Sequence, residues 1–284
     1  MKLNVFECRP VWLKFLRAVG LLLMMALLPR GVLGADFAVG VAPPHFELRG
    51  EPGSVVRDVL LMLNTANEFG DYRVRSADWS MDENGGVTIH GPELLESSCR
   101  PWVRIERHKV SLEPLGRRNY RFEIHIPENA AETECRFALL ISQALDENVG
   151  IDRERSQNSI RMPIAAQIAV IVYVAVGDAQ PELTFLSAGL EDGDKGLLPA
   201  LHLSNRGRAH GRPFGSLEGV DAAGNRHEFI VTPSPILAGS SGRVPLLYDP
   251  SLPTERIVPI VPPLELKGDV EYEQGLVPIE ARLN

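Results

Sequence analysis

The chain has 284 residues, of which 44% are hydrophobic and 23% charged, as in a folded globular protein, and its 25 Gly and 22 Pro argue against a helix bundle. It carries 29 Lys or Arg and 37 Asp or Glu, and residues 1–35 hold five of the basic residues and one of the acidic residues. The rest of the chain therefore has 24 basic and 36 acidic residues and a charge of −12. This acidic balance argues against nucleic acid or an anionic membrane surface as the main partner, because both require clustered Lys and Arg.

The first 35 residues have the order of a secretory signal peptide. Four basic residues precede the apolar run Leu21–Leu28, and a proline and the small residues Gly34 and Ala35 follow it. We therefore predict a cleaved signal peptide over residues 1–35 and a periplasmic protein. A retained membrane anchor is the alternative, because the stretch from Val11 to Leu28 is just long enough to span a bilayer.

Two cysteines, Cys99 and Cys135, follow the predicted signal peptide, and the third, Cys8, lies within it. An even pair in an oxidising compartment predicts a disulfide, with two buried thiols as the alternative. The chain has no C-x-x-C spacing, so a redox or nucleophilic role is not expected.

Alternation with a period of two recurs in the first half of the chain and predicts β-strands. In Tyr120–Ile126, four apolar residues alternate with Arg, Glu and His, and Pro127 ends the strand. The segment Val55–Leu63 is mostly apolar, which favours a place inside a sheet. Further strands are expected at Tyr72–Trp79, Trp102–Arg107 and Phe137–Ile141, and a single helical turn at Glu93–Ser97.

A polar segment, residues 146–159, is followed by the apolar segment Pro163–Val176. We interpret the first as a long surface loop. The second is too short to span a membrane, and its β-branched residues favour a strand over a helix. Both of its faces are apolar, so both must be covered by something.

Gly177–Pro181 is interpreted as a linker, beyond which short strands and turns start again. Expected strands are Leu183–Leu186, Leu197–Leu203, His227–Val231, Val244–Leu247, Leu264–Leu266 and Val277–Leu283. Short strands at regular spacing indicate sandwiches. We therefore predict an all-β chain with two sandwich domains in tandem after the signal peptide, at 36–177 and 178–284.

No motif points to catalysis or to a cofactor. The histidines are scattered, and His202 and His210, which flank an expected turn, are the nearest approach to a metal site. Glu191–Asp194 lacks the terminal Glu of a calcium loop, so a solvated hairpin tip is expected. We predict no enzyme activity, no metal site, no cofactor and no small-molecule substrate.

The order of these features resembles the periplasmic pilus-assembly chaperones. The similarity lies in a central strand that ends in Asn64, the turn Glu113–Gly116, which is similar to the family's P-x-x-x-x-L-x-P-G stretch, and a strand that ends at Pro127. The polar loop and the apolar strand Ile164–Val176 complete it. The similarity covers most of the first mature domain, whereas the second is similar only in its pattern of strands. It implies two immunoglobulin-like sandwiches.

In that family the chaperone lends an apolar strand to a pilus subunit that lacks one of its own, which is β-augmentation. The resemblance places this donor strand at Ile168–Val176. Two rows of side chains alternate along it. One row is Ile168, Val170, Val172 and Val174, and the other contains Ile171 and Tyr173. We predict that the first row contacts the client, because it is uniformly bulky.

The resemblance implies a pilus or fimbrial subunit as the partner, and an outer-membrane usher as a further one. The family anchors a client carboxylate with an Arg on the first strand and a Lys on the donor strand, and neither Ala42–Phe46 nor Ile168–Val172 contains these residues. The alternative function is an exported structural or adhesive sandwich protein without chaperone activity, in which the apolar strand is buried in its own core. A membrane-anchored sandwich protein is the third possible function. The sequence does not determine the client or the oligomeric state.

Overall fold

The computed structural model describes residues 38–144, 166–193, 196–251, 253 and 257–284. Within these ranges every regular element is a β-strand except one turn of 3₁₀-helix, η1 (Arg100–Trp102). No helix in the described residues is long and apolar enough to cross a membrane. The predicted signal peptide, residues 1–35, and the predicted polar loop, residues 146–159, lie outside the described ranges.

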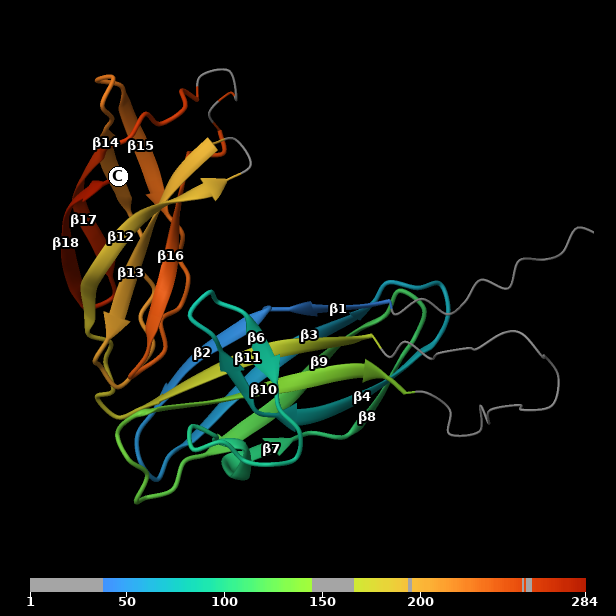
Figure 1. Cartoon of the computed structure of the whole chain (residues 1–284). Helices are drawn as coiled ribbons and strands as arrows, with labels where there is room; N and C mark the ends of the chain where they lie inside the picture. Colours follow the sequence, from blue (N-terminus) through green and yellow to red (C-terminus); the bar gives the residue numbers. More distant parts are fainter. Residues whose placement is uncertain (1–37, 145–165, 194–195, 252, 254–256) are drawn as a thin grey trace, which may run out of the picture. The chain divides into compact units, whose positions relative to one another are not determined.

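The strands from Val39 to Val176 form a sandwich of two sheets (Figure 1). One sheet has four strands, in the order β1 (Val39–Ala42), β3 (Val55–Asn64), β9 (Arg117–His125) and β7 (Val103–Ile105). The other has five strands, in the order β2 (His45–Gly50), β11 (Gln167–Val176), β10 (Glu134–Gln143), β4 (Gly70–Ala77) and β8 (Lys109–Leu112).

This strand order is that of an immunoglobulin-like sandwich, in which the first, second, fifth and fourth strands form one sheet and the third, sixth and seventh the other. The first strand is divided between the sheets. β1 pairs antiparallel with β3, and after Pro43 and Pro44 the chain crosses over, so that β2 pairs parallel with β11. The crossing gives β11 a neighbour on the side where a sheet edge would otherwise begin.

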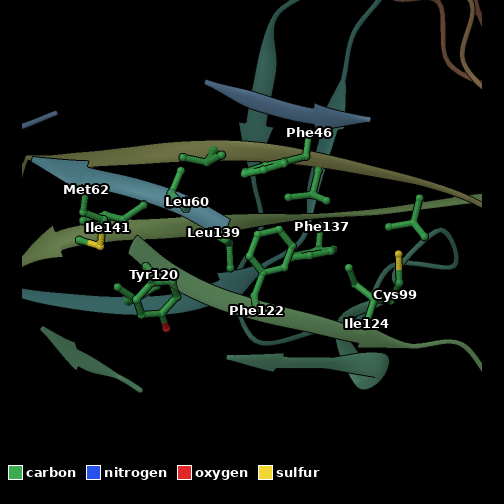
Figure 2. Packing of buried hydrophobic residues seen from close by; sticks show 14 of the residues in the cluster. Phe46, Leu60, Met62, Cys99, Tyr120, Phe122, Ile124, Phe137, Leu139 and Ile141 are labelled. Atoms are coloured by element: carbon green, nitrogen blue, oxygen red, sulfur yellow. The ribbon is translucent and has the colours of Figure 1, made fainter. Parts of the chain in front are cut away.

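The inner faces of the two sheets enclose one hydrophobic core, part of which is drawn in Figure 2. Phe122 of β9 makes edge-to-face contacts with Phe46 of β2, at 5.1 Å between ring centroids, and with Phe137 of β10, at 6.3 Å. The predicted alternation of Tyr120, Phe122, Ile124 and Ile126 is confirmed, because all four side chains are buried.

A short hairpin, β5 (Trp79–Met81) and β6 (Val87–Ile89), follows β4. The sequence predicted one strand from Tyr72 to Trp79, but the structure breaks it at Asp78, whose carboxylate accepts hydrogen bonds from the Leu95 N–H and the Ser98 hydroxyl. The break lets Trp79 pack on the outer face of the five-stranded sheet instead of continuing β4. No α-helical turn forms at the expected Glu93–Ser97.

The strands from Leu183 to Leu283 form a second sandwich with its own core, which includes Leu201, Phe229 and Leu266. Its strands follow the order β12 (Leu183–Gly193), β13 (Gly196–Asn205), β16 (Ser241–Leu247), β15 (Arg226–Val231), β14 (Ser216–Val220), β17 (Leu264–Tyr272) and β18 (Gly275–Leu283). The first residues of β16 pair with β13, and its last two pair with β15. This strand therefore passes from the sheet that contains β13 to the sheet that contains β15. The prediction of two immunoglobulin-like sandwiches in tandem is confirmed.

Contacts among Cα atoms group residues 37–284 into one compact unit, so the predicted boundary between 177 and 178 stays a prediction. The connection between the sandwiches is held by Arg49 at the end of β2, whose guanidinium donates to the carbonyl oxygens of Gly177, at 2.6 Å, and Ala179, at 3.0 Å. Gly207 lies against the same connection, and a Cβ there would stand 2.4 Å from the carbonyl oxygen of Gln180.

The predicted disulfide between Cys99 and Cys135 is confirmed, and it joins the segment before η1 to the start of β10. Its Cα atoms are 5.4 Å apart, within the normal range, and both cysteines are buried. The crosslink therefore fixes an otherwise irregular segment, residues 90–99, to the five-stranded sheet.

Replacing Cys99 and Cys135 together by Ala should lower the free energy of unfolding by up to about 4 kcal/mol, because the crosslink closes a loop of 36 residues in the unfolded chain. Urea unfolding of the variant and of the oxidised wild type measures the difference. The same loss should appear when the wild type is reduced, and equal stability of the reduced and oxidised proteins would contradict the prediction.

Candidate functional site

The candidate site is β11, and its two margins differ along its length. One margin pairs antiparallel with β10 over the whole strand, from Gln167 opposite Ser142 to Ala175 opposite Glu134. The other margin pairs with β2 only from Ile171, opposite His45, onwards (Figure 1). Among the described residues, the segment Gln167–Val170 therefore has no strand on its second side, whereas Ile171–Val176 is enclosed between two strands.

The predicted client-contact row faces the core of its own sandwich for most of its length. Val170, Val172 and Val174 are fully buried, at 0% exposure, in the same cluster as Leu60 and Phe137. Ile168 is half-buried at the edge of this cluster. Of the four residues, only Ile168 is within reach of a partner in this structure, and a client-binding role for the row stays a prediction.

The other row lies on the outer face of the five-stranded sheet. Tyr173 is buried against Trp79, with ring centroids 5.3 Å apart, and Ala169 and Ile171 are half-buried in the same cluster, which Leu237 of the second sandwich completes. The Trp79 indole N–H donates to the carbonyl oxygen of Phe137 at 3.1 Å. Both faces of β11 are thus covered, as its apolar composition requires.

A cluster of charged side chains lies beside Tyr173, where the two sandwiches meet. Glu134 of β10 is buried, and its Oε2 accepts hydrogen bonds from the His210 backbone N–H at 3.0 Å and from the His210 ring Nδ1 at 2.5 Å. His210 Nε2 lies 3.4 Å from Glu47 Oε1, and that oxygen accepts a hydrogen bond from Arg212 Nε at 2.6 Å. The imidazole of His210 stacks on Tyr173, with centroids 4.0 Å apart.

These contacts raise the pKa of His210 and lower the pKa of Glu47. Burial alone would lower the pKa of His210, but the hydrogen bonds and charges of Glu134 and Glu47 outweigh it and raise that pKa to about 9. The proton of His210, with the guanidinium of Arg212, lowers the pKa of Glu47 to about 2. Burial raises the pKa of the Tyr173 hydroxyl to about 12. At neutral pH His210 is therefore a cation between two carboxylates.

Within the described ranges, no group of three or more metal-ligating side chains comes together. His210 is paired with Glu134, whereas His202 lies on β13, so the two histidines flanking the expected turn do not form a common site. His227 contacts Asp221 Oδ2 at 3.3 Å and the Tyr248 hydroxyl at 3.0 Å, and this buried group holds the turn at 221–225.

Sequence reasoning did not find the Glu134–His210–Glu47 cluster. Glu47, Glu134 and His210 are separated by 87 and 76 residues of chain, and each resembles an ordinary polar residue in a strand or turn. The one available signal is Glu134 itself, a charged residue directly before Cys135 and the apolar run that begins at Phe137. A carboxylate in such a position requires a buried partner.

Comparisons with known proteins find similarity in solved structures only. No protein-family model matches the chain, and no curated protein matches it. Among the similar structures are the class 5 fimbriae chaperone CfaA, at 8% identity and a TM-score of 0.45, covering 87% of this chain and 99% of that one, and the Pseudomonas aeruginosa CupB2 chaperone, at 12% identity and a TM-score of 0.43, covering 84% and 97%.

The Salmonella enterica SafB chaperone in complex with the SafA pilin is similar at 10% identity and a TM-score of 0.43, covering 87% of this chain and 97% of that one. These structures are of the same kind of protein that the sequence resembles. At identities this low, the similarity does not show the role of any residue in this chain.

The charged cluster should make stability depend on pH above neutrality. Because folding raises the pKa of His210 from 6.5 to about 9, its contribution is fully present below about pH 6.5 and is lost as the pH rises through 9. We expect urea unfolding to show that His210→Gln is less stable than wild type at pH 6, by about 3 kcal/mol. This difference should shrink at pH 10.

Other groups titrate over the same range, so the difference between the two proteins is the quantity to follow, with His125→Gln as the control. His125 is exposed on β9. A gap between wild type and His210→Gln that stays constant from pH 6 to pH 10 would show that the charge of His210 does not contribute to stability.

Proposed function

We propose that the protein is an exported chaperone that binds an incomplete pilus or fimbrial subunit by strand pairing at the N-terminal half of β11. The observation that carries the proposal is the second margin of Gln167–Val170, which has no strand beside it among the described residues, while the same margin of Ile171–Val176 is paired with β2. An unpaired strand margin presents backbone N–H and C=O groups that a further strand can satisfy.

The buried row of β11 supports this role indirectly. Val170, Val172 and Val174 fix the strand in its own core, and β10 pairs with it along the other margin. The free margin is therefore held rigid, so a client loses less entropy on pairing than it would with a flexible segment. In this proposal Ile168 contacts the client, and the three valines position the strand.

The client in this proposal is a protein rather than a small molecule or nucleic acid, which agrees with the acidic charge of the chain. The SafB structure contains a pilin, the type of client that we propose here. Periplasmic location follows from the predicted signal peptide, and delivery to an outer-membrane usher belongs to the same proposal. No catalytic step is part of it.

The competing function is a structural or adhesive sandwich protein. The enclosure of Ile171–Val176 between β2 and β10 favours a structural role for that half of the strand. The two functions differ in whether the segment Gln167–Val170 binds a client. Substitutions in the two halves of β11 therefore distinguish them.

We expect Ile168→Asp to leave the fold intact and to lower capture of a co-produced pilus subunit at least tenfold, because a carboxylate at the free margin cannot enter an apolar groove without a cost. Val172→Asp should instead unfold the first sandwich, because it places a carboxylate in the core at a position with 0% exposure. Subunit recovered with the tagged protein from the periplasm, and thermal unfolding of each variant, are measured together.

Val59→Asp on β3 is the matched control, since Val59 is 39% exposed and lies on the other sheet. It should bind the subunit as the wild type does. A folded Ile168→Asp variant that captures as much subunit as the wild type would refute pairing at this margin. Failure of the wild type to retain any subunit would favour the structural sandwich.

A further inference from the structure

The outer face of one sheet of the second sandwich carries four exposed apolar side chains. This sheet follows the order β16, β15, β14, β17 and β18, and its strands are labelled in Figure 1. The four side chains are Phe214, Ile230, Leu247 and Leu276, which are 43%, 38%, 47% and 60% exposed. Residues that alternate with them, such as Phe229 and Val277, are buried in the core of the sandwich. The four side chains therefore point away from that core.

The strand register places these side chains in two rows across the sheet. Ile230 of β15 is the direct cross-strand partner of Leu247 of β16. Phe214 and Leu276 are both partners of Glu271 on β17, one on each side of it. Cross-strand partners point to the same face of a sheet, so each row presents its side chains together.

The two rows are neighbours and form one patch. Ile230 is also the partner of Ser216 on β14, which is two residues from Phe214, so the rows are roughly 7 Å apart. From β16 to β18 the patch crosses five strands, a width of about 19 Å at the usual strand spacing. Exposed apolar side chains gathered in this way mark an interaction surface.

Two carboxylates lie within the patch. Glu271 separates Phe214 from Leu276, and Asp269 lies two residues before Glu271 on the same exposed face of β17. Among the described residues, neither carboxylate has a hydrogen bond or an ion pair. The centre of the patch therefore carries two uncompensated negative charges.

The next row along the same face is acidic as well. Glu218 of β14 and Glu228 of β15 are direct cross-strand partners, an arrangement that repels. Lys267, the cation of this row, is already paired with Glu280 at 2.8 Å. A partner that brings apolar side chains and positive charges together would complement this face.

We propose that this patch docks an amphipathic helix of a partner protein, with apolar side chains on one face and Lys or Arg near its middle. A helix is about 10 Å across and rises about 1.5 Å per residue, so about 13 residues cover both rows from β16 to β18. Its apolar side chains cover the four exposed residues, and its cations meet Asp269 and Glu271. The patch belongs to the second sandwich and β11 to the first, so this inference does not rest on the proposed chaperone function.

A second copy of the chain is less suited to this face. Two copies related by a two-fold axis would bring the same patch of each together, and with it the carboxylates of Asp269 and Glu271. Like charges repel, and they do so more strongly once water is excluded from the contact.

Two labelled peptides of about 14 residues test the proposal on the purified protein by fluorescence anisotropy. Both carry Leu along one face of a helix, and beside the middle of that face one has Lys and the other Glu. We expect the Lys peptide to bind saturably and at least tenfold more tightly than the Glu peptide. This difference should shrink as the salt concentration rises from about 0.02 M to about 0.5 M, because salt screens exposed charges.

Leu276→Ser should weaken binding of the Lys peptide at least fivefold, whereas Leu186→Ser should leave it unchanged. Leu186 is the matched control, since it is 53% exposed on β12, in the other sheet of the same sandwich. Glu271→Gln should weaken binding at low salt and have no effect at about 0.5 M. Thermal unfolding shows whether each variant is folded.

The peptide pair keeps the test decisive on the unaltered protein, even if a variant does not fold. Failure of the Lys peptide to bind saturably, or equal binding of the two peptides at low salt, would overturn the proposal. So would a folded Leu276→Ser variant that binds the Lys peptide as the wild type does. A dimer in sedimentation that Leu276→Ser dissociates would instead assign the face to a second copy of the chain.

Discussion

The parallel pairing between β2 and β11 begins at Ile171, and the functional interpretation of the molecule depends on this limit. Every backbone N–H and C=O in a sheet needs a partner, and among the described residues β11 is paired on both sides only where β2 accompanies it. The crossover at Pro43 and Pro44 sets that limit, because proline cannot donate to a sheet ladder and so ends β1 before β2 starts. A strand that is fixed in a core on one half and open along one margin on the other half is suited to pairing with another chain.

The neighbouring strand, β10, packs one face against the hydrophobic core and carries charged residues at the start of its other face. Its odd-numbered residues from Cys135 to Ile141 face the core, while Glu134 and Arg136 lie on the opposite face near the second sandwich. The Glu134 carboxylate is buried, and its Oε2 pairs with His210, whereas its Oε1 has no hydrogen-bond partner among the described residues. A substitution at Glu134 would therefore disturb the contact with His210 of the second sandwich.

Arginine at the end of the first strand has a structural role in this chain. Arg49 donates to the carbonyl oxygens of Gly177 and Ala179 and so fixes the connection between the sandwiches. Two of its N–H groups are committed to the backbone, and it lies opposite Ala175, at the other end of β11 from the open margin. Recognition of a client at that margin would then rely on backbone pairing and apolar contact rather than on a buried charge pair, whose desolvation is expensive.

The sequence by itself predicted the all-β class and the two sandwiches and favoured a disulfide over two buried thiols, because alternation, turn residues and an isolated pair of cysteines are local signals. It also identified β11 as an apolar strand that needs cover on both faces. Only the tertiary structure decided which row of β11 faces the core, since period-two alternation is symmetric between the faces and the choice of Val170, Val172 and Val174 depends on contacts with Leu60 and Phe137. The Glu134–His210–Glu47 cluster was equally hidden, because its residues are distant in sequence and meet only when the two sandwiches pack together.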